Sequence, residues 1–107
     1  MRSHVLLIGG RSGVGKSTAA LALHEELKRA DVSHALIEGD NLDQAHPAPH
    51  VAHPDAGLAE RNLAFMWSRY RELGYRRLIF TNTVSVVQVR TLADAMGDDP
   101  EVTAALL

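Results

Sequence analysis

A stretch near the N-terminus has the residue types and the order needed to hold a phosphate chain. Residues 10–17 read GRSGVGKS and fit the pattern G-x-x-x-x-G-K-[ST] in full. Glycines let the backbone come close to a ligand, so that successive N–H groups face phosphate oxygens. Lys16 would bring a mobile positive charge to the outer phosphates, and Ser17 a hydroxyl for Mg²⁺. The residues predicted to hold a nucleoside triphosphate are Gly10, Arg11, Ser12, Gly13, Val14, Gly15, Lys16, Ser17 and Thr18.

The elements around this loop support that interpretation over a glycine-rich turn that holds a lysine by chance. Residues 4–8 are apolar, partly β-branched and bounded by glycine, which predicts a buried strand. Residues 16–30 are rich in Ala, Leu, Glu and Lys, with apolar positions at helical spacing, which predicts an amphipathic helix. The loop therefore lies between a strand and a helix, where the N-terminal end of the helix adds positive charge.

The rest of the chain continues the alternation of strands and helices. "SHALIEGD" predicts a second strand that ends near Glu38, and "YRRLIFTNT" predicts a third. "VTAALL" could start a helix, but its place after a helix and a turn with proline favours a fourth strand. Residues 41–57 hold all but one of the prolines and predict a loop or cap. A helix is expected over residues 84–97. Another is expected to end at Gly74, because apolar residues precede that glycine at helical spacing, namely Leu63, Met66, Trp67, Tyr70 and Leu73. This order predicts a single α/β domain over residues 1–107, a parallel sheet between two layers of helices.

Composition narrows the class of protein. The chain has 107 residues, a net charge of −2 and no cysteine, which excludes disulfides, zinc fingers and cysteine nucleophiles. A charge this close to zero argues against a nucleic-acid partner. No apolar run approaches the ~20 residues that span a bilayer, and the apolar run at the N-terminus is too short for a signal peptide. We therefore expect no membrane partner and a cytoplasmic location.

Two stretches make the sequence resemble the P-loop small-molecule kinases, which include adenylylsulfate kinase, gluconate kinase, shikimate kinase and chloramphenicol phosphotransferase. "GGRSGVGKSTAALAL" is typical of this family, and "LIEGDNLD" looks like its acidic signature after the second strand. The resemblance implies ATP and Mg²⁺ as cofactors. It also implies that Asp40 faces the acceptor hydroxyl, that Glu38 holds a water of Mg²⁺, and that Arg61 grips the substrate.

Physical reasoning supports the role of Asp40 but leaves alternatives for the other residues. A carboxylate at the carboxyl edge of a parallel sheet lies in the crevice where ligands bind, and it could orient or deprotonate a hydroxyl. Glu38 and Asp40 could instead simply end a strand and cap a turn. Arg61 could be a solvated charge at a helix start. The proline-rich stretch holds three histidines, His46, His50 and His53. No carboxylate pattern accompanies them, so we expect a surface or substrate-cap role rather than a metal site.

The sequence departs from the family in two ways. Thr81 and Asn82 end the third strand, where many P-loop proteins have an acid that helps to hold Mg²⁺. The family also has a fifth strand, in the order 2-3-1-4-5, and a lid that bears arginines. We therefore expect a form truncated after the fourth strand, with weak or no kinase activity. Its exposed sheet edge would favour self-association.

The favoured function is a kinase that transfers the γ-phosphate of ATP to a hydroxyl of a small-molecule acceptor. Lys16 would stabilise phosphate charge, Ser17 would hold Mg²⁺, and Asp40 would act on the acceptor. Two alternatives remain at this point: a nucleotide-binding module without transfer chemistry, and an NTPase that hydrolyses ATP. The sequence carries no N-K-x-D guanine signature, which disfavours GTP.

Overall fold

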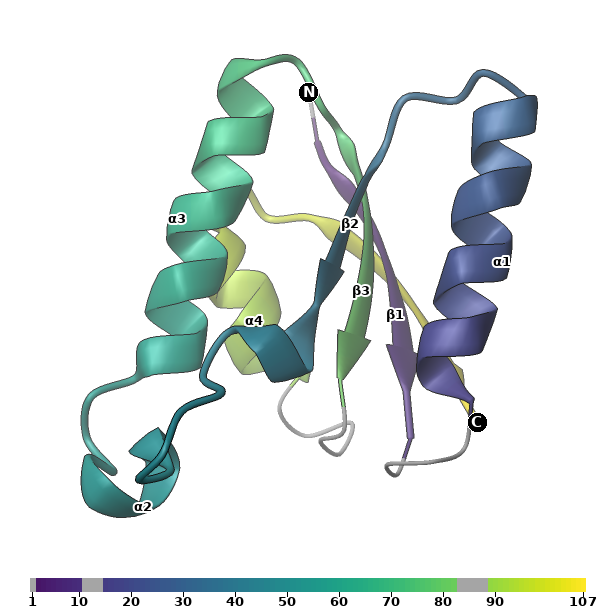
Figure 1. Ribbon diagram of the computed structural model, residues 1–107. Coiled ribbons are helices and arrows are strands. Elements are labelled where there is room, and N and C mark those ends of the chain that lie inside the picture. Colours follow the sequence, from purple (N-terminus) through teal and green to yellow (C-terminus); the bar gives the residue numbers. More distant parts are fainter. Residues whose placement is uncertain (1, 11–14, 83–88) are drawn as a thin grey trace.

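The computed structural model describes residues 2–10, 15–82 and 89–107. In these ranges the elements follow in the order β1 (His4–Gly9), α1 (Lys16–Arg29), β2 (Ala35–Glu38), a 3₁₀ turn η1 (Gly39–Asn41), α2 (Pro49–Ala52), α3 (Leu58–Glu72), β3 (Arg77–Asn82), α4 (Val89–Met96) and β4 (Glu101–Leu106). The strands form one parallel sheet in the order β2-β3-β1-β4. Helices lie on both faces of this sheet (Figure 1). The predicted three-layer α/β fold is confirmed, with the first four strands in the family's order.

Alternating side chains along the strands divide the core into two clusters. Register pairs Val5 with Leu78 and Leu7 with Phe80, and these side chains pack toward α3 and α4 together with Leu63. The intervening positions face the other way, where a smaller cluster packs against α1, and this cluster contains Ile8, Ala20 and Ile79 with Leu6, Leu23, Leu27 and Leu36 around it. Because strand side chains alternate between faces, apolar residues at successive positions bury both faces of the sheet.

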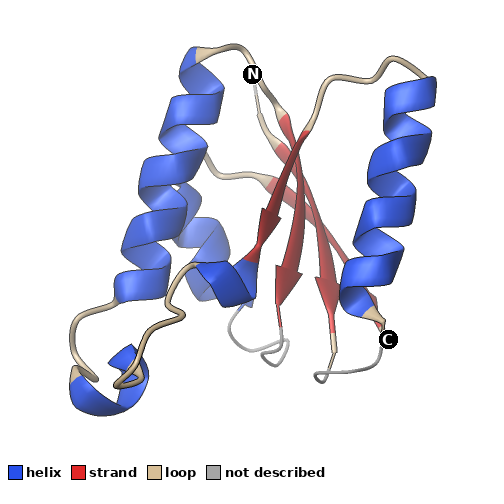
Figure 2. Cartoon of the chain, viewed as in Figure 1, coloured by secondary structure: helices blue, strands red, loops and turns tan. Residues whose placement is uncertain are grey.

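The helices cover the two faces unequally. α1 lies on one face, and α3 and α4 lie together on the other (Figure 2). The side chain of Trp67 on α3 is fully buried at the centre of the larger cluster. In the part of the chain that the structure describes, no helix is long and apolar enough to span a bilayer.

The row of apolar positions that predicted α3 is only partly buried. Leu63 and Trp67 are buried, but Met66 and Leu73 are exposed, Leu73 to 77%. At about 100° per residue, Met66 and Leu73 lie more than roughly 90° around the helix from Trp67. The buried stripe of α3 is therefore narrower than its apolar pattern suggested.

A polar cluster closes the end of the sheet where the strands begin. The buried Ser3 hydroxyl hydrogen-bonds to the carboxylate of Asp98, whose side chain is only 6% exposed. Arg71 of α3 pairs with the same carboxylate, Nε to Oδ2, at 3.4 Å. The cluster joins β1, α3 and the turn before β4 far from the strands' carboxyl ends.

The opposite end of the sheet, where the strands terminate, carries the irregular segments. Residues 41–57, expected to be a loop or cap, contain the single turn α2 and otherwise little regular structure. Asn62 on α3 donates from Nδ2 to the backbone oxygen of Leu42 at 2.5 Å, which ties the start of this segment to the core. Among the described strands, β4 pairs only with β1, and Thr103, Ala104 and Ala105 on it are exposed.

Candidate active site

The start of α1 has the geometry of an anion-binding helix terminus. β1 ends at Gly9 and α1 begins at Lys16, with Gly15 as its N-cap in a left-handed conformation, φ 90°. The cap makes no side-chain hydrogen bond, and the first turn carries no acidic residue among the residues described. The positive end of the helix dipole therefore lies at the end of α1 that follows β1. The loop's predicted strand–helix context is confirmed, while Arg11, Ser12, Gly13 and Val14 lie outside the described residues.

Lys16 and Ser17 occupy the first turn of α1. Lys16 is only 7% exposed, which is unusual for a lysine and holds its ammonium group close to the protein. Ser17 Oγ donates to Glu38 Oε2 at 3.3 Å, joining α1 to the end of β2. A hydroxyl beside a carboxylate is a set of hard oxygen donors, the kind that Mg²⁺ prefers. The two residues predicted for the metal, Ser17 and Glu38, are thus brought together. Thr18 follows on the exposed side of the helix.

Gly39 holds the chain after β2 close to the end of β3. A Cβ built at Gly39 would lie 2.3 Å from the backbone oxygen of Thr81 and 3.1 Å from Cζ of Phe80. Only glycine fits this approach. The turn η1 that begins at Gly39 then presents Asp40 at the carboxyl edge of the sheet, as predicted, where its side chain is exposed.

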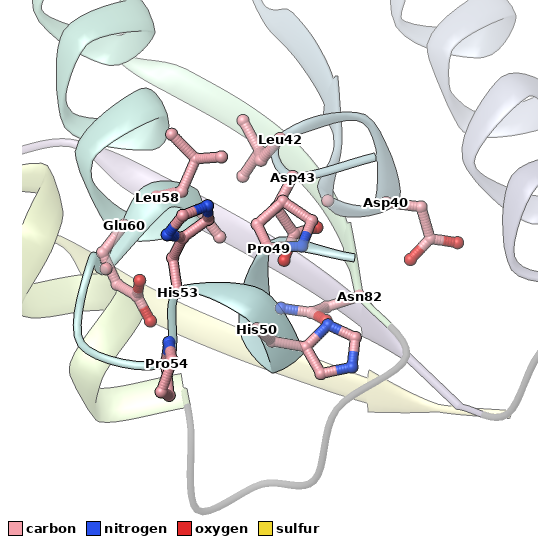
Figure 3. Close-up of a pocket in the computed structure, with 13 residues that line it drawn as sticks. Asp40, Leu42, Asp43, Pro49, His50, His53, Pro54, Leu58, Glu60 and Asn82 are labelled. Atoms are coloured by element: carbon pink, nitrogen blue, oxygen red, sulfur yellow. The ribbon is translucent and has the colours of Figure 1, made fainter. Parts of the chain in front are cut away.

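A cavity of about 530 Å³ opens beside Asp40. Figure 3 shows that its walls come from η1, from the α2 segment, from the start of α3 and from the end of β3. The polar residues that line it are Asp40, Asp43, His50, His53, Glu60 and Asn82. The larger apolar residues are Leu42, Pro49, Pro54 and Leu58. Its size is that of a pocket for a small molecule.

The three histidines of the proline-rich stretch separate in the structure. His50 and His53 line the cavity, whereas His46 is exposed and is not among the lining residues. No group of three His, Cys, Asp or Glu side chains in the described ranges is arranged to hold a metal ion. The surface or substrate-cap role of the three histidines stays a prediction.

Arg61 lies one residue beyond the lining residue Glu60, and its side chain is exposed outside the cavity. Its predicted contact with a substrate stays a prediction. Asn82, one of the two neutral residues noted at the end of β3, lines the cavity through its amide group, whereas Thr81 is buried.

Several lining residues were not predicted, above all Asp43 and Glu60. Asp43 is the last residue of the "LIEGDNLD" stretch, and Glu60 is an acid in the first turn of α3. A carboxylate at either place is common at a turn or helix start, so neither carries a signal of its own. The cavity forms where the α2 segment and the start of α3 lie beside the turn after β2 and the end of β3, an arrangement that no local pattern encodes.

Comparison with known proteins supports the family resemblance. The family model for adenylylsulphate kinase matches residues 2–48, from β1 into the segment before α2. Two structures of the Mycobacterium tuberculosis APS kinase CysC share 22% identity with this chain, at TM-scores of 0.59 and 0.60. The match covers 98% of this chain and 75% and 62% of theirs, and the second structure is a complex with AMPPNP and APS.

A gluconokinase from Sinorhizobium meliloti 1021 matches with a TM-score of 0.57 and 16% identity, over 99% of this chain and 58% of its own. A search of curated protein sequences found no match. At these identities the solved structures establish the fold. Together with the family model, they confirm the resemblance to the N-terminal portion of the P-loop small-molecule kinases.

Proposed function

We propose that this chain, which has the fold of the P-loop small-molecule kinases, binds Mg·ATP and transfers the γ-phosphate to a hydroxyl of a small-molecule acceptor. Residues 1–107 would act as one nucleotide-binding domain. The observation that carries the proposal is the hydrogen bond between Ser17 Oγ and Glu38 Oε2, 3.3 Å, beside the start of α1. It joins the predicted phosphate-binding helix to the strand whose end leads into the acceptor cavity.

The nucleotide would lie along the start of α1. Backbone N–H groups there and the Lys16 ammonium would hold the outer phosphates, while Ser17 and Glu38 would direct oxygens toward Mg²⁺. When bound, Mg²⁺ would neutralise charge on the β- and γ-phosphates. The low exposure of Lys16 supports this role, because a charge in a restricted position loses less entropy when it contacts a phosphate.

The acceptor would occupy the cavity on the other side of Asp40. In the transfer, the acceptor oxygen forms a bond to the γ-phosphorus, and the bond from that phosphorus to the β–γ bridging oxygen breaks with its electron pair leaving on ADP. The hydroxyl proton passes to the Asp40 carboxylate. The position of Asp40 supports this step, since Asp40 lies in the turn η1 after β2 and lines the cavity. The predicted contact of Arg61 with the acceptor is kept as part of the proposal, and it requires this exposed side chain to turn toward the cavity.

The nucleotide part is tested by calorimetry of Mg·ATP binding to Lys16→Ala. Losing an ammonium that faces phosphate should weaken binding by roughly ten-fold to a hundred-fold. Lys28→Ala is the matched control, because Lys28 is an exposed lysine in the last turn of the same helix. Unchanged affinity in Lys16→Ala would refute the assignment of the phosphate site.

The transfer part is tested with labelled ATP and a panel of small hydroxyl compounds. Asp40→Asn should lower the transfer rate by roughly 10²- to 10⁴-fold with little change in Mg·ATP affinity. Asp55→Asn is the control, since Asp55 is an exposed acid of the same segment that does not line the cavity. Release of phosphate without any acceptor would instead support an NTPase, and binding without turnover a nucleotide-binding module.

A further inference from the structure

Carboxylates dominate the charged side chains that line the acceptor cavity. Asp40, Asp43 and Glu60 contribute three of them, and no lysine or arginine in the described part of the chain lines it. In Figure 3, Asp40 and Glu60 lie on opposite sides of the cavity, with Asp43 between them in this view. A ligand in the cavity therefore meets negative charge along its length.

Among the described residues, the nearby cations Lys16 and Arg61 are not lining residues. If Arg61 turns toward the cavity, as the proposed function requires, the three carboxylates still outnumber it. A triphosphate held by α1 would add further negative charge next to Asp40. An acceptor that carries a sulfate, phosphate or carboxylate would thus be repelled both by the cavity wall and by the nucleotide.

The remaining walls suit a compact polar ligand with a carbon skeleton. Pro49 and Leu42 are buried and form a firm apolar surface, and Leu58 and Pro54 extend it. His50, His53 and Asn82 offer groups that donate or accept hydrogen bonds with hydroxyls. A volume of about 530 Å³ has room for a ligand of one or two sugar rings.

We propose that the acceptor is a polyhydroxy compound that bears an ammonium group, an amino sugar or amino alcohol. This rests on the proposed kinase function. Asp43 and Glu60 hold the ammonium group, while Asp40, at the sheet edge, receives the reacting hydroxyl. The same carboxylates that repel an acidic acceptor stabilise an ammonium group, so the charge of the acceptor contributes to the specificity of the cavity.

The test measures the charge preference of the cavity without knowledge of the natural acceptor. Three nitroxides of matched size are used as probes, one with an ammonium group, one with a carboxylate and one neutral. Each is added at equal concentration, and NMR records the relaxation that it causes at the side chains of Asn82 and His50. At low salt we expect the ammonium probe to exceed the carboxylate probe by about five-fold at these side chains, and salt to reduce the difference.

A double variant, Asp43→Asn with Glu60→Gln, should bring this ratio most of the way to one. The control double variant, Asp55→Asn with Glu72→Gln, removes the same charge from exposed positions outside the cavity and should leave the ratio nearly unchanged. Equal or greater relaxation from the carboxylate probe in the parent protein would overturn the proposal. A loss of preference in both double variants would also overturn it, because the effect would then come from net charge.

Transfer assays separate this inference from the kinase proposal. An amino sugar, its parent sugar and the corresponding sugar acid are compared as acceptors with labelled ATP. Phosphorylation of the amino sugar ahead of the other two supports the inference, and phosphorylation of the sugar acid ahead of the amino sugar overturns it while the kinase function stands. If Mg·ATP does not bind, the kinase function fails, and the nitroxide ratio still decides the charge preference of the cavity.

Discussion

Gly39 is a position at which a single added methyl group should disturb the sheet. In Gly39→Ala, the new Cβ would start 2.3 Å from the backbone oxygen of Thr81, inside the distance at which carbon and oxygen repel. The neighbours cannot yield easily, because Thr81 belongs to β3 and Phe80 is buried with 2% exposure. The end of β2 must therefore move away from β3 by about 1 Å, a shift of the kind that overpacking forces on a core.

Overpacking of this size costs about 1–3 kcal/mol of unfolding free energy. For a domain of this length, each kcal/mol lowers Tm by about 4–8 °C, so thermal unfolding should shift down by roughly 5–20 °C. The same movement carries Glu38 and Asp40, the two neighbours of Gly39. It should break the contact between Ser17 and Glu38 at 3.3 Å and weaken Mg·ATP binding.

The matched control is Gly74→Ala, which changes glycine to alanine at the C-terminal end of α3. A Cβ there meets no atom within 4 Å, but φ is +97°, which disfavours alanine. This variant should lose about 1 kcal/mol of stability and keep full Mg·ATP affinity, because α3 ends at the far end of the sheet (Figure 1). Circular dichroism melting and calorimetry measure both effects. A Gly39→Ala variant with the parent's Tm and affinity would refute the reasoning.

Three other predictions concern an ion pair, the solvation of a tryptophan and self-association. Arg71→Ala should lower the unfolding free energy by about 2–3 kcal/mol, because it leaves the buried Asp98 carboxylate without its cation. Arg69→Ala, on the exposed side of α3, is the control and should change it by less than about 0.5 kcal/mol; denaturant titration measures both. Trp67, fully buried, should fluoresce at short wavelength and resist iodide quenching until the protein unfolds; strong quenching in the native state would contradict its position. Sedimentation should detect self-association through the outer edge of β4, and Thr103→Lys should reduce it; a monomer at all concentrations would contradict this prediction.

The sheet and the start of α1 could be predicted from the sequence because their signals are local. Residues 10–17 carry a motif whose spacing implies its own strand–helix context, and the apolar runs that became β1, β2 and β3 are short and bounded. The position of Asp40 could be predicted for a related reason, because it follows the end of a parallel strand, while its role stays a prediction.

The features that escaped prediction depend on contacts between distant parts of the chain. Gly39 looks like an ordinary turn glycine until β3 lies beside β2. Asp98 lies in the turn before β4, and its burial requires Ser3, just before β1, and Arg71 of α3 to come together with it. Leu73 shows the opposite case, because it belongs to the apolar row that predicted α3 and yet is exposed to 77%.

Most of the cavity wall comes from one part of the chain, and this bears on how the ligand specificity of the cavity could evolve. Apart from Gly39, Asp40 and Asn82, all the residues that line the cavity come from one continuous stretch, residues 42–60. This stretch contributes no strand to the sheet and is anchored through Leu42, Pro49 and the hydrogen bond from Asn62. Under the proposed function, substitutions between these anchors would alter the acceptor while the sheet and α1 keep their contacts. Selection could then exchange one acceptor for another in small steps that leave the stability of the sheet unchanged.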